Sequence, residues 1–180
     1  MYSFRNDYSE GAHPKVLQAL ADTNLRQTVG YGMDPCCQAA ADTIRRLCAA
    51  PDAAVHFLVG GTQVNLVTID AFLQSYEAVV AAQTGHVSTH ETGAIEATGH
   101  KVCTVESPDG KLTPALVESV LAGHNGTEHM VLPRMVYISD TTEIGTVYTR
   151  AELAALRQCC DVHGLFLYLD GARLGSALTS

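Results

Sequence analysis

The sequence predicts an α/β fold with a mostly parallel β-sheet and helices on both faces. Short apolar runs alternate with amphipathic stretches of helical length, which is the pattern of successive β-α units. The last apolar run, residues 165–169, lies between Gly164 and Gly171 and is typical of a buried strand in a parallel sheet. With 180 residues, 47% of them hydrophobic and 17% charged, the chain is globular and can bury a sizeable core.

Capping residues indicate where several helices begin. Pro14 and Pro35 suit a first helical turn, and Asp34 is a suitable N-cap. Thr149 and Glu152 have the spacing of a capping box. The first predicted helix begins at Pro14. Further helices are predicted at 35–49, 63–73, 113–123 and 149–163, with a short helix within 86–97. The predicted strands cover 54–59, 78–82, 101–105, 135–139 and 165–169. Side chains expected to face inward in the first two helices are Val16, Leu17, Leu20, Ile44, Leu47 and Cys48.

Charge and composition exclude several classes of partner. A net charge of -8 argues against nucleic acid and against an anionic membrane surface. The polar start indicates no signal peptide, and no apolar run is long enough to cross a bilayer. No C-x-x-C spacing occurs, so neither a zinc site nor a disulfide framework is indicated. We therefore expect a cytoplasmic protein with reduced cysteines at positions 36, 37, 48, 103, 159 and 160.

The chain contains no internal repeat and no Pro-, Gly- or Ser-rich linker, so residues 1–180 are expected to form one domain. Residues 1–30 form its N-terminal segment and helix. The sequence stops shortly after the predicted strand 165–169, with no closing helix or polar tail. We therefore expect the chain to be part of a longer protein.

Candidate site residues follow predicted strands. The turn 60–62, Gly-Gly-Thr, lies between a strand and a helix, where backbone N–H groups and the helix dipole suit a single phosphate. An ordinary tight turn explains the same residues. The turn has neither the dinucleotide fingerprint nor the lysine of a Walker A loop.

A histidine and a carboxylate follow two other strands. His86 could stack on a flat ligand or act as a base, and Asp170 could bind a ligand at the carboxyl end of its strand. The alternatives are a solvated loop histidine and an aspartate that caps its turn and pairs with Arg173. His86 and His90 lack a third ligand, so no metal site is expected.

Three further polar residues leave two interpretations open. Glu91 is either a buried, hydrogen-bonded acid or a charge that favours a helix start. Asp140 and Thr142 follow a strand and either line the site or form a plain turn.

The predicted strand ends bring a phosphate turn, a histidine and an aspartate to one edge of the sheet. A phosphate, a flat ring and a carboxylate facing a ring nitrogen together describe pyridoxal phosphate. The carboxylate keeps the pyridine nitrogen protonated, so that the ring can withdraw electrons from a carbanion.

At these residues the chain resembles the low-specificity threonine aldolase and β-eliminating lyase family of fold-type-I pyridoxal-phosphate enzymes. The ordered set of matching segments is specific, although each one alone is not. These segments are residues 4–7, Gly61 and Thr62, His86 with residues 91–94, residues 138–143 and residues 169–173.

The resemblance implies a role for each matched residue. Gly61 and Thr62 would bind the cofactor phosphate, and His86 would stack on the ring and accept the substrate hydroxyl proton. Asp170 would pair with the ring nitrogen. Substrate contacts are implied for Arg173, which also belongs to the cofactor-binding set, and for Asn6 and Tyr31. Family members are dimers or tetramers with shared active sites, so a homo-oligomer is expected.

Two departures from the family pattern affect the interpretation. The family's Schiff-base lysine lies beyond the Asp-Gly-Ala-Arg segment, and none of Lys15, Lys101 and Lys111 is in a matching context. The chain alone is therefore expected to be inactive, and the family's C-terminal small domain is expected to be absent from it. Many threonine aldolases have a histidine near the position of Thr142. Its absence from this sequence puts threonine itself in question as the substrate.

For the parent protein the sequence indicates a lyase in amino-acid metabolism. We expect aldol cleavage of a threonine-like β-hydroxy amino acid to glycine and an aldehyde. One alternative is β-elimination on another amino acid. The others are a catalytically incomplete α/β fragment, with a role in assembly or with no role, and a simple phosphate- or nucleotide-binding domain.

Overall fold

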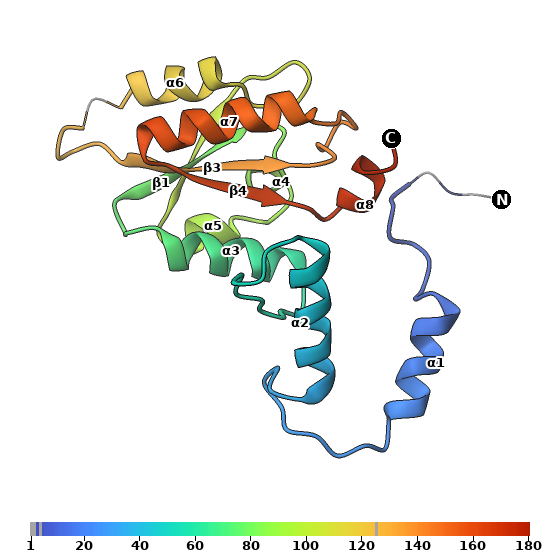
Figure 1. Cartoon of the computed structure of the whole chain (residues 1–180). Helices are drawn as coiled ribbons and strands as arrows, with labels where there is room; N and C mark the ends of the chain where they lie inside the picture. Colours follow the sequence, from blue (N-terminus) through green and yellow to red (C-terminus); the bar gives the residue numbers. More distant parts are fainter. Residues whose placement is uncertain (1–2, 4, 125) are drawn as a thin grey trace. The chain divides into compact units, whose positions relative to one another are not determined.

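The computed structural model describes residue 3 and residues 5–124 and 126–180, in two compact units, Met1–Phe57 and Leu58–Ser180. The first unit contains helices α1 (Pro14–Thr23) and α2 (Pro35–Leu47). The second contains every strand of the described residues (Figure 1). None of the described helices is both long enough and apolar enough to span a membrane.

A four-stranded parallel sheet forms the centre of the second unit. Its strands are β1 (Glu77–Ala82), β2 (Lys101–Val105), β3 (Leu132–Ser139) and β4 (Phe166–Asp170), in the order β2-β1-β3-β4. Ser139 pairs with Asp170, so β3 and β4 end side by side. Parallel neighbours need a crossover, and the helices between the strands supply it. The predicted parallel α/β fold is confirmed.

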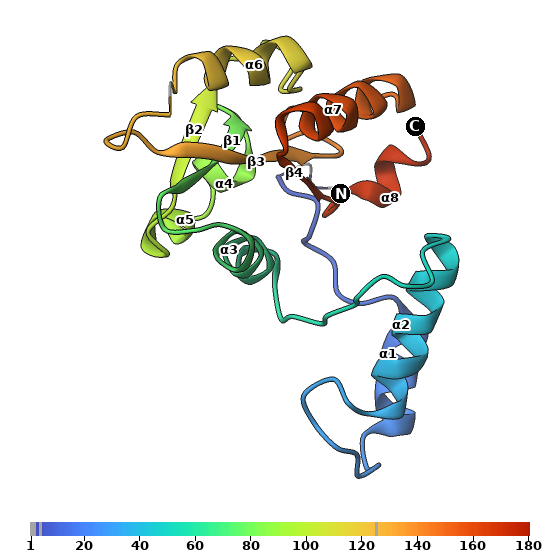
Figure 2. The same cartoon turned by 60° about the vertical axis from the view of Figure 1, so that its left-hand side comes forward.

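Helices cover both faces of this sheet. Figures 1 and 2 show α3 (Gly61–Phe72) and α5 (Ala94–Ala97) on one face, with α6 (Pro114–Ala122) and α7 (Arg150–His163) on the other. The short helices α4 (His86–Thr89) and α8 (Leu174–Ala177) follow β1 and β4. Each face has its own apolar core: Ile69 and Ile95 lie in one, and Val117 and Leu156 in the other. Both faces of the central strand β1 are thus buried, which explains its apolar run at 78–82. The edge strands β2 and β4 are only partly covered, so the burial expected for the strand at 165–169 is incomplete.

The predicted helix caps form as expected. The Asp34 side chain accepts from the N–H groups of Cys36 and Cys37. Thr149 and Glu152 make both hydrogen bonds of the capping box at the start of α7. Gly164 ends α7 with a φ of 63°, a left-handed conformation that glycine adopts without steric cost.

The predicted strand at residues 54–59 was wrong. This segment has no regular secondary structure, and Val59 is 95% exposed. A strand needs ladder partners for its N–H and C=O groups, and the described residues provide none for this segment. It also includes Phe57 and Leu58, where the two units meet in the sequence.

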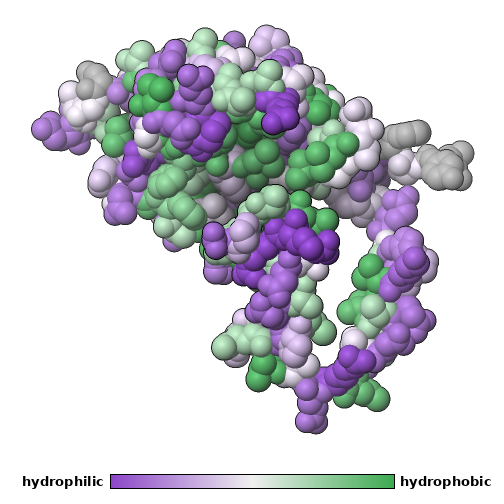
Figure 3. All heavy atoms as spheres, in the orientation of Figure 1, coloured by the Kyte–Doolittle hydropathy of each residue, from purple (hydrophilic) through white to green (hydrophobic). Residues whose placement is uncertain are grey.

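The expected inward-facing side chains of the first two helices are also wrong. Among the described residues of the first unit, Ala41 alone is buried. Hydrophobic side chains run along one side of α1 and polar ones along the other (Figure 3). An amphipathic helix buries its apolar stripe only against a second surface, and this unit provides none for Leu17, Leu20 or Leu47.

The capping box of α7 gives a stability prediction. Thr149→Ala removes the side-chain acceptor of the Glu152 N–H and should lower the free energy of unfolding by about 1 kcal/mol, measured by urea denaturation. The Lys111 ammonium, and then the Thr149 N–H and hydroxyl, lower the pKa of Glu152 from 4.5 to about 2. This carboxylate therefore contributes stability that is fully present above pH 4.5 and is lost as the pH falls towards 2.

Glu152→Gln should accordingly be less stable than the wild type at neutral pH, and the difference should shrink across that acidic window. The exposed Glu106→Gln serves as the matched control. A pH-independent difference for Glu152→Gln would contradict the assigned ion pair.

Candidate active site

The carboxyl ends of β1, β3 and β4 gather the candidate residues in the second unit. Asp170 is the last residue of β4, and Ser139 is the last residue of β3 beside it. His86 begins α4, four residues after β1 ends at Ala82. The parallel direction of the strands places these residues at one edge of the sheet, as the sequence predicted.

His86 is oriented by a buried carboxylate. Its Nδ1 lies 2.7 Å from Oε1 of Glu91, whose side chain has no exposed surface. A carboxylate accepts hydrogen bonds, so Nδ1 is the donor to Glu91, and in a neutral imidazole this leaves the lone pair on Nε2. The imidazole itself is about one third exposed, at 32%. Of the two interpretations of Glu91, the buried, hydrogen-bonded acid is therefore the correct one.

Three donors hold the carboxylate of Asp170. Its Oδ2 accepts from the Tyr137 hydroxyl at 2.7 Å and from the Asn65 amide at 3.1 Å. Its Oδ1 accepts from the N–H of Ala172 at 3.0 Å, which leaves this oxygen a second lone pair. Burial and the nearby charge of Asp170 raise the pKa of Tyr137, so its phenol remains a donor.

Asn65 connects the two acids, and sequence reasoning missed it. Its Nδ2 donates to Glu91 Oε1 at 2.5 Å as well as to Asp170, and its Oδ1 accepts from the Tyr168 hydroxyl at 2.5 Å. The available signal was a polar residue one helical turn before the fully buried Ile69, on the inward face of α3. Tyr137 and Tyr168 were missed because apolar strands usually contain such side chains for packing alone.

Gly61 and Thr62 form the first turn of α3, three residues before Asn65. Gly60 precedes them in an extended conformation, and α3 has no side-chain N-cap. A Cβ built on Gly60 or Gly61 would meet no atom within 4 Å, so the space beside this turn is open. An uncapped helix start with open space is compatible with an anion.

Arg173 lies in the turn after β4 and pairs with Glu143, with Nη1 3.1 Å from Oε2. The alternative in which it pairs with Asp170 stays a prediction. Asp140 is buried and accepts from the N–H of Tyr148 at 3.3 Å, which is the turn interpretation.

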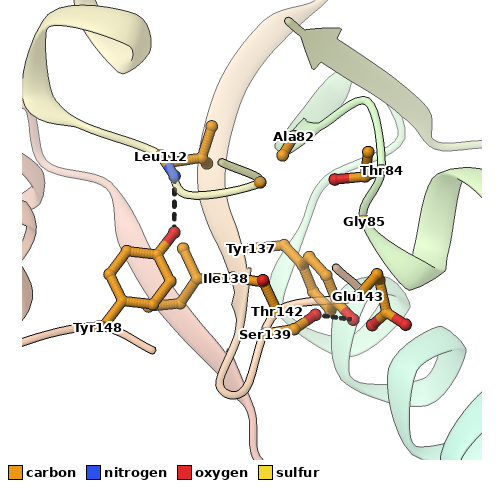
Figure 4. A pocket seen from close by; sticks show the side chains of 11 residues that line it. Ala82, Thr84, Gly85, Leu112, Tyr137, Ile138, Ser139, Thr142, Glu143 and Tyr148 are labelled. Atoms are coloured by element: carbon orange, nitrogen blue, oxygen red, sulfur yellow. Dashed lines mark hydrogen bonds between the residues drawn. The ribbon is translucent and has the colours of Figure 1, made fainter. Parts of the chain in front are cut away.

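The hydroxyl of Thr142 is hydrogen-bonded within its own turn. Its Oγ1 lies 2.6 Å from the Thr146 hydroxyl and accepts from the Thr146 N–H at 3.0 Å. Figure 4 shows Tyr137, Thr142 and Glu143 around a cavity of about 10 Å³, which has room for about one water. This cavity is too small for a substrate.

The remaining residues that the sequence singled out come from other segments of the chain. Asn6 and Tyr31 belong to the first unit, so their substrate contacts stay predictions. Phe4, the first residue of one matching segment, lies outside the described residues. Lys111 donates to Glu152 at 2.6 Å, and Lys101 begins the edge strand β2.

A family model described as β-eliminating lyase matches residues 4–180. The chain belongs to the β-eliminating lyase family. Low-specificity L-threonine aldolase of Pseudomonas sp. (strain NCIMB 10558) is 37% identical over 176 residues, or 97% of this chain and 50% of that protein. The corresponding protein of Saccharomyces cerevisiae is 28% identical over a match that spans 96% of this chain and 44% of that protein.

Solved structures of similar proteins agree with the fold. A threonine aldolase structure from Leishmania major is 57% identical with a TM-score of 0.97, covering 100% of this chain and 52% of that one. An aminotransferase structure from Mycobacterium tuberculosis is 19% identical with a TM-score of 0.67, covering 93% of this chain and 45% of that one. At this identity the likeness shows the fold alone. This member of the β-eliminating lyase family thus spans about half the length of the relatives that it matches.

The hydroxyl of Tyr137 gives a testable stability prediction for this family member. Tyr137→Phe removes a buried donor to an ionised carboxylate and should lower the free energy of unfolding by about 1.5 to 3 kcal/mol, measured by urea denaturation. The control is Tyr76→Phe, an exposed tyrosine expected to change it by less than about 0.5 kcal/mol. Equal stabilities of the two variants would show that the Asp170 contact contributes nothing.

Proposed function

We propose that the protein containing this chain is a pyridoxal-phosphate-dependent lyase that cleaves a threonine-like β-hydroxy amino acid to glycine and an aldehyde. The observation that carries this proposal is the carboxylate of Asp170, anchored by three donors at the end of β4 with a free lone pair on Oδ1. The similarity to threonine aldolases over nearly the whole chain supports the same reaction.

The residues present fit this cofactor in three respects. Asp170 Oδ1 can accept a hydrogen bond from a protonated pyridine nitrogen. His86 offers a partly exposed ring whose orientation is held by Glu91. The uncapped start of α3 at Gly61 and Thr62 suits a phosphate. When bound, the cofactor supplies a ring that withdraws electrons from the carbon at which the substrate bond breaks.

The chain's own residues then have separable roles. Asp170 keeps the proton on the ring nitrogen, because an anion held by three hydrogen bonds favours a protonated partner. His86 stacks on the ring and uses the lone pair of Nε2 to take the hydroxyl proton of the substrate. Arg173 binds the substrate carboxylate, and Glu143 pairs with its Nη1.

Aldol cleavage is favoured over the sister reaction, β-elimination, by the similarity to threonine aldolases. The hydroxyl of Thr142 is bonded to Thr146, so His86 is left as the base for the substrate hydroxyl. The Schiff-base amine must come from a lysine other than Lys15, Lys101 and Lys111. Lys111 is paired with Glu152, Lys101 begins the edge strand β2, and Lys15 is not in a segment that matches the family's lysine.

We further propose that the whole protein is a cytoplasmic homo-oligomer. The exposed apolar stripe of α1, which includes Leu17 and Leu20, supports burial against another subunit. All six cysteines are free, which supports a reducing compartment. A single-subunit mass for the full-length protein in light scattering would contradict the oligomer.

The decisive experiment is Asp170→Ala in the full-length protein. Aldehyde release from threonine, allo-threonine and phenylserine should fall by at least about 100-fold, since a positioned electrostatic group typically contributes that much. The control is Asp161→Ala, an exposed carboxylate on α7 that should leave turnover unchanged. Release of pyruvate or another keto acid in place of an aldehyde would favour β-elimination.

A further inference from the structure

Asn65 is the only described side chain with recorded hydrogen bonds to both carboxylates of the cluster. Asn65 is 2% exposed, and each of its recorded side-chain hydrogen bonds joins it to a residue of the site. Its amide nitrogen carries two protons, one for Glu91 and one for Asp170. Its amide oxygen accepts from the Tyr168 hydroxyl. Because the amide has only two N–H groups, this arrangement uses both donors of the side chain.

These contacts fix the amide plane from three directions. The two acids come from different parts of the fold, since Glu91 precedes α5 and Asp170 ends β4. Glu91 in turn holds Nδ1 of His86, so the position of the imidazole depends on where Asn65 places Glu91. The neutral amide also separates two carboxylates that would otherwise face each other across a poorly solvated space.

We propose that Asn65 is a positioning residue that sets the distance and orientation between the His86 ring and the Asp170 carboxylate, so that one group meets the face of a flat pyridine ring and the other its ring nitrogen. This inference rests on the proposed function. Asn65 lies one turn beyond Thr62 on α3, so the same helix places the phosphate turn and aligns the two groups that contact the ring. A rigid helix thereby gives both ends of the ligand one common reference.

The test uses the full-length protein, with pyridoxal phosphate itself as the probe. Asn65→Asp keeps the shape of the side chain, removes both donors and adds a third carboxylate. Cofactor affinity, measured by absorbance titration, should fall at least about 10-fold, as for the loss of a partner that orients a ligand-binding group. Tyr168→Phe keeps both donors and loses only the acceptor contact, so its affinity should lie between that of Asn65→Asp and the wild type.

A second measurement separates positioning from a general structural role. In the cofactor-free protein, the ring nitrogens of His86 should report one Nδ1–H tautomer by NMR, and Asn65→Asp should give a mixture. Ser107→Ala, which removes a buried hydroxyl bonded to Asp109 and Lys111, is the control and should change neither readout.

The outcomes distinguish this inference from the proposed function. Absence of cofactor binding by the wild type would overturn the proposed function. Binding by the wild type with unchanged affinity in folded Asn65→Asp would overturn the role of Asn65. If Asn65→Asp fails to fold, wild-type affinity in Tyr168→Phe would overturn it instead.

A separate cluster lies on the helices that cover the opposite face of the sheet. Cys159 and His163 are four residues apart on α7, so they share one side of that helix. Glu118 on α6 faces them, with Oε1 3.5 Å from Nε2 of His163. The three ligand atoms all lie within 4.8 Å of one another. Zinc with tetrahedral bonds of about 2.0 to 2.3 Å places its ligand atoms roughly 3.3 to 3.6 Å apart.

The geometry points to a zinc site at Glu118, Cys159 and His163, with water as the fourth ligand. A thiolate, an imidazole and a carboxylate form the borderline-soft set that Zn²⁺ prefers, and the His163–Glu118 spacing already matches a shared ion. The ion would join α6 to α7, whose side chains Val117 and Leu156 lie in the same apolar core.

The test is a Co²⁺ titration of the full-length protein with Cys36, Cys37 and Cys48 replaced by Ser, so that the non-buried thiols of this chain cannot bind metal. A near-ultraviolet thiolate-to-cobalt band should reach saturation at one ion per chain and disappear on addition of Zn²⁺. His163→Ala and Cys159→Ala should each abolish it.

His124→Ala is the matched control, because His124 and Cys103 form another thiol–imidazole pair, at 3.7 Å. A band that survives His163→Ala but is lost in His124→Ala would assign the metal to that pair and overturn the proposal. Absence of any band would show that the cluster is only a weak ion pair beside a buried thiol.

Discussion

The common direction of β1, β3 and β4 is the constraint on which the site depends. In a parallel sheet all carboxyl ends meet at one edge, so the residues that follow each strand become neighbours whatever their separation in sequence. His86 and Asp170 are 84 positions apart by number, yet they belong to one hydrogen-bonded cluster through Glu91 and Asn65. The helices on both faces make this direction possible, because each supplies a crossover between parallel strands.

Holding two acids close together in a poorly solvated place costs free energy unless donors compensate. The cluster meets this cost with hydrogen-bond donors. Tyr137 and Asn65 serve Asp170, and Asn65 and His86 serve Glu91. Burial raises the pKa of Tyr168 to about 12, so its phenol also stays protonated and donates to Asn65. Among the buried side-chain oxygens and nitrogens of this network, Oε2 of Glu91 lacks a recorded partner.

Local signals in the sequence predicted most elements of the second unit. The strand 101–105 was predicted with its observed bounds, and the capping box of α7 formed as expected. The strand at 54–59 was wrong because a strand also needs a neighbouring ladder, which local pattern does not report. For the same reason the stripes of α1 and α2 are exposed: periodicity shows which side is apolar and not what will cover it.

The sequence by itself determined the fold class, the family and the edge of the sheet at which His86 and Asp170 lie. Those properties follow from apolar periodicity, caps and short motifs, which are local in the chain. The tertiary structure alone decided the hydrogen bonds of Asn65, Glu91 and Tyr137, the pairing of Arg173 with Glu143, and the approach of Glu118 to Cys159 and His163. Each of these contacts joins residues from different helices, strands or loops, so it exists only after the sheet and its helices have packed together.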